Sequence, residues 1–383
     1  MELLNTITGF GGSMFQYIFG FISVLMVIVF VHEMGHFIVA RWCNVRIEAF
    51  SVGFGRELLG YTDKKNTRWK LCLIPLGGYV KFWGDNGAAS FADGDALKNM
   101  SVADREVCFQ TKPLWKKSAV VVAGPIANFI FSIAIFTTFL MVYGQPFVLP
   151  KVDAVSDGGA AQIAGIQKND IIIAYGNNDV DSFADLQKNV MFSANKTSTI
   201  TVTRGDKILT LTITPKKFVF KDKFGDEQTI GRIGIVHQSS AEERTFKTLS
   251  LPSAVYSSVG EVGFIIKQSL IAIKDLVIGQ GDVKQLGGPV KIAQYSGNLA
   301  SEGILPLIRL AALLSIGIGL FNLFPIPMLD GGHLVFYFIE SIIGRPLPPK
   351  YMEYAMRVGI TLLLGFFIFV TVNDIGSIVQ KLT

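Results

Sequence analysis

The sequence predicts a polytopic α-helical membrane protein with four transmembrane helices, a membrane-associated β-sheet and an inserted α+β domain. Hydrophobic residues make up 50% of the 383 residues and charged residues only 17%, and the mean hydropathy is +0.43. This composition is typical of a membrane protein with room for a soluble insert. Apolar runs long enough to cross a bilayer lie at about residues 14–40, 118–143, 305–328 and 354–378.

The positions of these runs predict the domain organisation. Residues 1–143 form a first membrane half and residues 305–383 form a second. Residues 144–217 contain short strand and helix patterns, with a hairpin signature at Gly205-Asp206, which predicts an α+β domain. Residues 218–304 are expected to be a linker followed by an amphipathic interfacial segment, because charges interrupt its apolar helical spacing.

The first apolar run is predicted to remain as a transmembrane helix, since its start has no Lys or Arg and no small-residue cleavage site. Arg41 and Arg46 follow it, and the positive-inside rule places that end in the cytoplasm. Three strands are expected next, at 45–54, 68–74 and 78–82. Their apolar content indicates a sheet that lies against the membrane, although an ordinary cytoplasmic hairpin fits the pattern equally well.

The net charge of +5 is modest and unclustered, so nothing indicates a nucleic-acid partner. The three cysteines, Cys43, Cys72 and Cys108, have no metal or redox spacing, and an odd number argues against a disulfide framework.

A metal-binding pattern, His32-Glu33-Met34-Gly35-His36, lies near the end of the first apolar run. Residues four apart share one face of a helix, so His32 and His36 can present two imidazoles to one metal ion. Glu33 lies beside them, where a carboxylate can take a proton from a water molecule on the metal. Two structural histidines on a buried helix are the alternative. It is disfavoured because ionisable groups inside a membrane are costly and a bound metal offsets that cost.

A second chemical signal is Asp330, which lies where prolines and glycines interrupt the third apolar run. Irregular backbone at membrane depth must face protein or a water-filled cavity, and an acidic residue there predicts a functional site. Catalytic zinc sites keep three protein ligands and one open position, so Asp330 can complete a set with His32 and His36. The alternative role for Asp330 is a turn or helix-capping carboxylate.

Three other polar residues each allow two interpretations. His333 can be a ligand, but its place beyond Asp330 in a Gly-Gly turn favours a supporting or interfacial role. Asn322 can donate a hydrogen bond either to a substrate or to a neighbouring helix. His237 is expected to be an ordinary surface or core residue of the soluble part.

These motifs together resemble the site-2 proteases, a family of zinc intramembrane metalloproteases, and in particular the bacterial regulator of sigma-E protease branch. The resemblance covers nearly the whole chain. The matching stretches are His32 to His36, Gly77 to Lys81, Ala123 to Pro125 with Asn128-Phe129, and Asn322 to Gly332.

The resemblance implies a zinc-dependent endopeptidase that cleaves transmembrane segments of single-pass membrane proteins, such as trimmed anti-sigma factors or signal-peptide remnants. It implies that His32, His36 and Asp330 bind Zn²⁺ and that Glu33 is the catalytic base. The protein would lie in the bacterial inner membrane, with its active site near the cytoplasmic side. The partners would be membrane-protein substrates and the lipid bilayer.

Substrate binding is expected at Asn322 and on the sheet at Gly78, Tyr79 and Val80, whose exposed edge can pair with an unwound substrate strand. The resemblance also implies that the α+β insert is a PDZ-like domain in the periplasm. Well-known members of the branch carry two such domains, whereas this chain has room for one.

A catalytically silent membrane PDZ adaptor or chaperone with a structural zinc site is the alternative function. Glu33 distinguishes the two, because a structural site needs no base.

Overall fold

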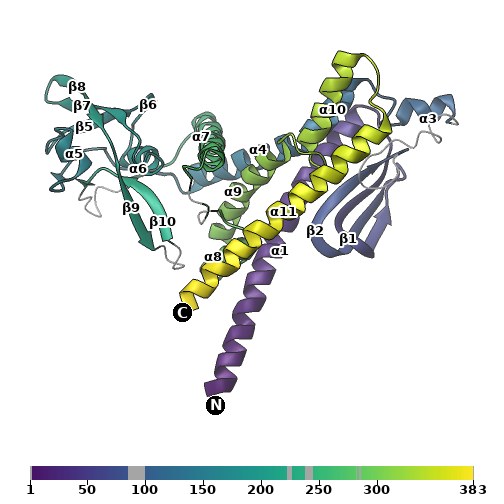
Figure 1. Ribbon diagram of the computed structural model, residues 1–383, viewed down its shortest axis with the longest axis horizontal. Coiled ribbons are helices and arrows are strands. Elements are labelled where there is room, and N and C mark those ends of the chain that lie inside the picture. The colour runs from purple at the N-terminus through teal and green to yellow at the C-terminus, as the bar shows by residue number, and fades with distance from the viewer. Residues whose placement is uncertain are drawn as a thin grey trace. The chain divides into compact units, whose positions relative to one another are not determined.

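The computed structural model describes residues 2–84, 100–221, 227–237, 245–281, 283 and 286–382 (Figure 1). The chain divides into two units. We call residues 1–136 with 257–383 the membrane unit, and residues 137–256 the α+β unit.

Four helices of the described chain are long and apolar enough to cross a membrane. They are α1 (Glu2–Trp42), α4 (Leu114–Val142), α9 (Ile304–Asn322) and α11 (Pro349–Leu382). This confirms the four apolar helices that the sequence predicts. The third ends at Asn322 rather than near residue 328, because Pro325 and Pro327 cannot continue a helix.

Small side chains and hydroxyl groups join α4 to α9. Ser132 Oγ on α4 donates to the carbonyl of Ala312 on α9 at 2.8 Å. In return, Ser315 Oγ on α9 donates to the carbonyl of Asn128 on α4 at 3.1 Å. Helices in lipid associate through such close packing and hydrogen bonds rather than through hydrophobic burial. Helices α4 and α9 are therefore held together directly, and both lie beside α1.

The sheet of the membrane unit consists of two long strands, β1 (Ile47–Thr62) and β2 (Arg68–Phe82), which each bend into two arms. Ser51 of β1 pairs with both Tyr79 and Lys70 of β2. The arms consequently lie in the order 78–82, 47–52, 68–72, 57–62, with 78–82 at one edge.

The two short strands expected at 68–74 and 78–82 are thus one bent strand, β2. The bend coincides with Pro75 and with Gly77, whose φ of +125° suits glycine.

Among the described residues, four further helices belong wholly or partly to the membrane unit: α3 (Val102–Val107), α7 (Leu251–Val277), α8 (Pro289–Glu302) and α10 (Asp330–Ile343). Asp374 of α11 is fully buried. Its carboxylate accepts hydrogen bonds from the backbone N–H groups of Gly288, Val290 and Lys291 at 3.0–3.1 Å. A helix N-terminus attracts an anion, so this carboxylate attaches α8 to α11.

The α+β unit centres on a four-stranded antiparallel sheet in the order β6-β5-β7-β8. The strands are β5 (Ile171–Tyr175), β6 (Asn178–Asp179), β7 (Ser198–Arg204) and β8 (Lys207–Ile213). The helices α5 (Ala160–Ile163) and α6 (Phe183–Met191) belong to the same unit. Its core contains Ile172, Leu186 and Ile200.

The remaining strands of the α+β unit form three short antiparallel pairs. They are β3 (Gln145–Phe147) with β12 (Thr245–Lys247), β4 (Ala154–Val155) with β11 (Ile235–Val236), and β9 (Lys216–Lys221) with β10 (Glu227–Arg232). Residues 216–236, mostly assigned to a linker in the sequence analysis, therefore contain strands of this unit.

Candidate metal centre

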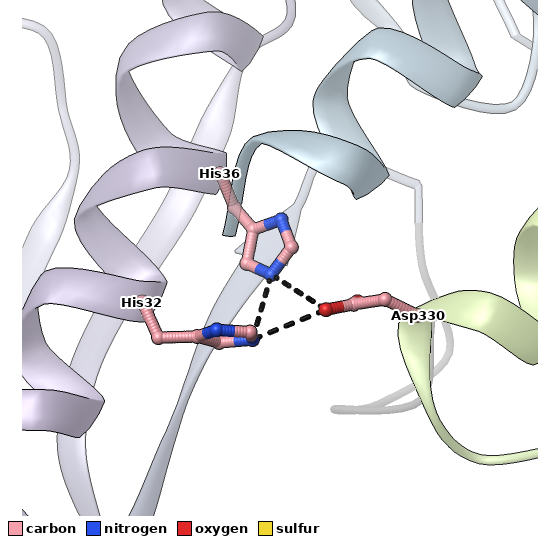
Figure 2. Close-up of side chains that lie close together, drawn as sticks. All are labelled: His32, His36 and Asp330. Atoms are coloured by element: carbon pink, nitrogen blue, oxygen red, sulfur yellow. Dashed lines mark hydrogen bonds and ion pairs between the residues drawn. The ribbon is translucent and has the colours of Figure 1, made fainter. Parts of the chain in front are cut away.

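Two imidazoles and one carboxylate meet in the membrane unit (Figure 2). His32 and His36 point from α1 toward Asp330 at the start of α10. The two Nε2 atoms lie 3.2 Å apart. Asp330 Oδ2 lies 3.1 Å from His32 Nε2 and 3.6 Å from His36 Nε2. The structure therefore brings together three predicted site residues that are distant in sequence.

The spacing of these donor atoms fits a small tetrahedral cation. Metal–ligand bonds of about 2.0–2.1 Å place neighbouring donors about 3.3 Å apart in tetrahedral geometry, and the observed separations are 3.1–3.6 Å. Asp330 Oδ2 is buried without a properly oriented hydrogen-bond donor. Such a carboxylate oxygen is costly unless a cation compensates it. Two histidines and one aspartate are a suitable donor set for zinc.

A tight turn between α9 and α10 positions Asp330. Met328 has a φ of +85°, which is rare for a residue with a side chain. Gly331 follows, and a Cβ atom there would lie 2.2 Å from the Phe324 carbonyl oxygen. Only glycine permits this approach, so the Gly-Gly sequence lets the chain fold back and begin α10 with the aspartate facing α1.

Helix α4 packs against the two histidine side chains. His36 Nδ1 lies 2.8 Å from the carbonyl oxygen of Val120 and donates to it, which leaves Nε2 available for a metal. Gly124 lies one turn further along α4. A Cβ atom at this position would be 2.3 Å from His36 Nε2 and 2.9 Å from the His32 ring. The missing side chain is therefore what makes room for both imidazoles.

A cavity of about 330 Å³ adjoins the three donors, and Glu33 lines it. The Glu33 carboxylate accepts a hydrogen bond from the backbone N–H of Val80 on β2. A Cβ atom on Gly78 would lie 3.2 Å from Glu33 Cγ, so the strand edge passes close to this side chain. The cavity thus adjoins the three donor atoms, the Glu33 carboxylate and the 78–82 edge of the described sheet.

The other residues considered as site candidates either line the same cavity or, in the case of His237, lie in the α+β unit. Tyr79 and Asn322 also line the cavity, and Asn322 Nδ2 donates to the carbonyl of Ile318 on its own helix at 3.0 Å. His333 lines the cavity but lies outside the three-donor cluster. His237 belongs to the α+β unit, where its Nδ1 lies 2.9 Å from Asp153 Oδ2.

Comparison with known proteins identifies the family. The model of peptidase family M50 matches residues 20–366. The chain belongs to this family. It is therefore a membrane metalloprotease that depends on zinc, which confirms the resemblance drawn from the motifs.

Relatives match along nearly their whole length. A protein of Agrobacterium fabrum that bears the name of a zinc metalloprotease is 45% identical over 376 residues, covering 98% of this chain and 100% of its own. The metalloprotease MmpA of Caulobacter vibrioides is 36% identical over 376 residues, covering 92% of this chain and 94% of its own. Among solved structures, the PDZ domain of an SdrC-like protein from Listeria monocytogenes is 23% identical, covers 24% of this chain and 86% of its own, and has a TM-score of 0.18.

The role of Gly124 on α4 was not predicted from the sequence. The structure places this glycine against the two imidazoles. The sequence signal for this role is the four-residue spacing of Gly124 and Asn128. It places a position without a side chain and a side-chain amide on the same face of the helix.

Proposed function

We propose that this protein is an endopeptidase that cuts transmembrane segments, with His32, His36 and Asp330 as its zinc ligands. The observation that carries this proposal is the three-donor cluster beside Glu33, built partly on a helix that is apolar enough to cross a membrane. A soluble protease has no need to place its ligands there, since ionisable groups in a membrane helix are costly.

Each residue has a defined task. When bound, zinc supplies a Lewis acid that polarises the scissile carbonyl and makes an attacking water more acidic. His32, His36 and Asp330 hold the ion and leave one position open. Glu33 takes the proton of the attacking water and delivers it to the leaving amine. The hydrogen bond from Val80 N–H keeps the Glu33 carboxylate turned toward the cavity.

The substrate must be unwound before attack, because a membrane helix satisfies its peptide groups internally. The β2 arm 78–82 lies at the edge of the described sheet and next to Glu33. We propose that this arm pairs with the unwound segment and presents the peptide bond to the base. Tyr79 supplies an aromatic contact there, and Asn322, which also lines the cavity, offers a side-chain amide.

We propose that the α+β unit is a PDZ-like domain that excludes substrates with bulky extracytoplasmic parts and admits stubs left by an earlier cut. The chain connects this unit directly to α4 and, through α7 and α8, to α9. Gln145 of β3 pairs with Lys247 of β12, so a short glycine linker can replace the residues between them. Exclusion predicts that this deletion extends cleavage to full-length substrates. Recruitment of a new C-terminus would instead make the deletion slow the cleavage of stubs.

We propose a bacterial inner-membrane location, with the α+β unit in the periplasm and the β1–β2 turn in the cytoplasm. Arg41 in the last turn of α1 and Arg46 just after this helix support this orientation. Cys43, Cys72 and Cys108 are buried, so a membrane-impermeant maleimide should label an Asp206→Cys variant in intact spheroplasts and spare Lys65→Cys. Labelling of only the Lys65→Cys variant would invert the orientation.

The test of the activity compares membrane-protein fragments in cells that carry the native chain or Glu33→Gln. Short stubs of single-pass proteins should accumulate only in the variant. Equal fragment patterns would remove the support for an intramembrane endopeptidase.

A further inference from the structure

The two histidines of the metal centre differ in how their second ring nitrogen is held. His36 Nδ1 faces a backbone carbonyl, which can only accept a hydrogen bond and therefore leaves Nε2 free for a metal. His32 Nδ1 faces the side-chain amide of Asn128, with Asn128 Nδ2 at 3.3 Å. An amide can donate or accept, depending on which of its two ends faces the ring.

The orientation of this amide decides whether His32 can bind a metal through Nε2. If Nδ2 donates to Nδ1, the ring carries its proton on Nε2, the atom that faces His36 and Asp330. If Oδ1 faces Nδ1, it accepts the Nδ1 proton and Nε2 is free. In the structure Asn128 Oδ1 is buried and has no hydrogen-bond partner, so this oxygen can accept the Nδ1 proton of His32 once the amide rotates.

We propose that Asn128 is a positioning residue for the metal centre: with zinc bound, its Oδ1 accepts the Nδ1–H of His32 and fixes the tautomer that presents Nε2 to the ion. This inference rests on the proposed ligand set. It requires only a rotation of the amide, because the oxygen and nitrogen ends have nearly the same shape.

The surroundings hold the Asn128 backbone in place for this task. Its carbonyl accepts hydrogen bonds from Ser132 Oγ at 3.0 Å and from Ser315 Oγ at 3.1 Å. A Cβ atom on Gly319 would lie 3.1 Å from Asn128 Cβ, so α9 closes over the residue. Asn128 is 0% exposed, which rules out direct contact with a substrate in this arrangement. It therefore acts through His32.

The test measures Zn²⁺ affinity of the full-length protein in detergent, by competition with a chromophoric chelator. Asn128→Leu removes the acceptor and keeps the approximate volume, so affinity should fall about 10- to 100-fold, the range for partners of metal-bound histidine. Asn128→Asp can only accept from Nδ1–H and should retain affinity within about threefold. The visible spectrum of the Co²⁺-loaded protein should change in Asn128→Leu and stay native in Asn128→Asp.

Thr137→Val is the control on the same helix, since Thr137 is a buried polar residue of α4 that lies nine positions from Asn128. It should leave zinc affinity unchanged. Native affinity in Asn128→Leu would overturn the proposal, as would an equal loss in Thr137→Val. If Asn128→Asp fails to fold, the comparison of Asn128→Leu with Thr137→Val decides.

A His32→Ala variant separates this inference from the proposed function. If His32→Ala keeps full zinc affinity, the ligand set itself is wrong. If His32→Ala loses zinc and Asn128→Leu does not, only the role of Asn128 fails.

Discussion

Two aspartates with buried carboxylate oxygens, one in each unit, have surroundings that differ in the positive charge and the donors they supply. Asp170 of the α+β unit is 0% exposed. Arg204 donates to both of its oxygens at 2.8 Å, and the Gln167 N–H donates at 2.9 Å. Asp330 Oδ2 of the membrane unit lies 3.1 and 3.6 Å from two imidazole nitrogens and has no properly oriented donor among the described residues.

This difference distinguishes the two roles: the Asp170 carboxylate stabilises the fold, whereas the Asp330 carboxylate is available to a ligand. The protein itself supplies the positive charge for Asp170, so its burial is compensated without any added group. At Asp330 the chain supplies two imidazoles in place of a guanidinium, and the spacing of the three donor atoms fits a small cation. Incomplete satisfaction of a buried charge is therefore the observation that locates the site.

The largest expected effect is on zinc affinity, when each of the two aspartates is substituted separately. Asp330→Ala should lower zinc affinity by more than about 100-fold and abolish cleavage, because a direct ligand matters more than its supporting residues. Asp170→Asn, which removes the satisfied charge, should keep native zinc content. Metal analysis of both purified variants checks this. Equal zinc content in the two would remove the contrast.

A smaller loss of zinc affinity is expected when the space beside the imidazoles is filled by a side chain. Gly124→Ala places a Cβ atom 2.3 Å from His36 Nε2, so the rings must shift and zinc affinity should fall about 10- to 100-fold. Gly317→Ala on α9 is the matched control, since nothing lies within 4 Å of its Cβ position. Chelator competition measures both. Similar affinities would mean that the centre tolerates displacement of its ligands.

The mildest effect should be local to the α+β unit. Asp170→Asn should make amide exchange in β5 and β7 faster by a factor on the order of ten. The effect is no larger because solvent reaches Arg204 and weakens the ion pair. Hydrogen exchange of the full-length protein measures this, with the amides of α4 as an internal reference. Unchanged exchange in β5 and β7 would show that the pair does not stabilise the unit.

The same pair predicts a pH dependence of known sign. Burial raises the pKa of Asp170, but the hydrogen bonds from Arg204 and Gln167 outweigh it and hold that pKa below its ordinary value. A lowered folded-state pKa gives stability that is complete above the ordinary carboxyl range near about pH 4 and is lost as the pH falls through the folded-state pKa. The protection factors of the β5 amides, which are corrected for the intrinsic pH dependence of exchange, should fall on acidification in the native chain and fall less in Asp170→Asn.

The residues of the candidate metal centre could be predicted from the sequence, whereas the pairing of Asp170 with Arg204 could not. His32, Glu33 and His36 are identifiable because helical periodicity turns their spacing into a shared face. Asp330 is identifiable because prolines and glycines around a carboxylate are unusual in an apolar run. Local patterns of this kind determine which residues carry the chemistry.

The supporting residues could not be predicted in the same way. Gly124 and Val120 matter through an absent atom and a backbone carbonyl, and neither leaves a chemical signature in a sequence. The bend in β2 that makes 78–82 an edge depends on pairing between distant residues. Strand patterns alone cannot distinguish one bent strand from two short ones.

The central claim is that the three-donor cluster holds zinc and that Glu33 carries out the proton transfer. The most direct measurement determines zinc content and cleavage of a single-pass membrane substrate together, on purified Glu33→Gln beside the native chain. The account predicts about one zinc per chain in both proteins and no cleavage by the variant. A variant that still cleaves at the native rate with its zinc in place would contradict it.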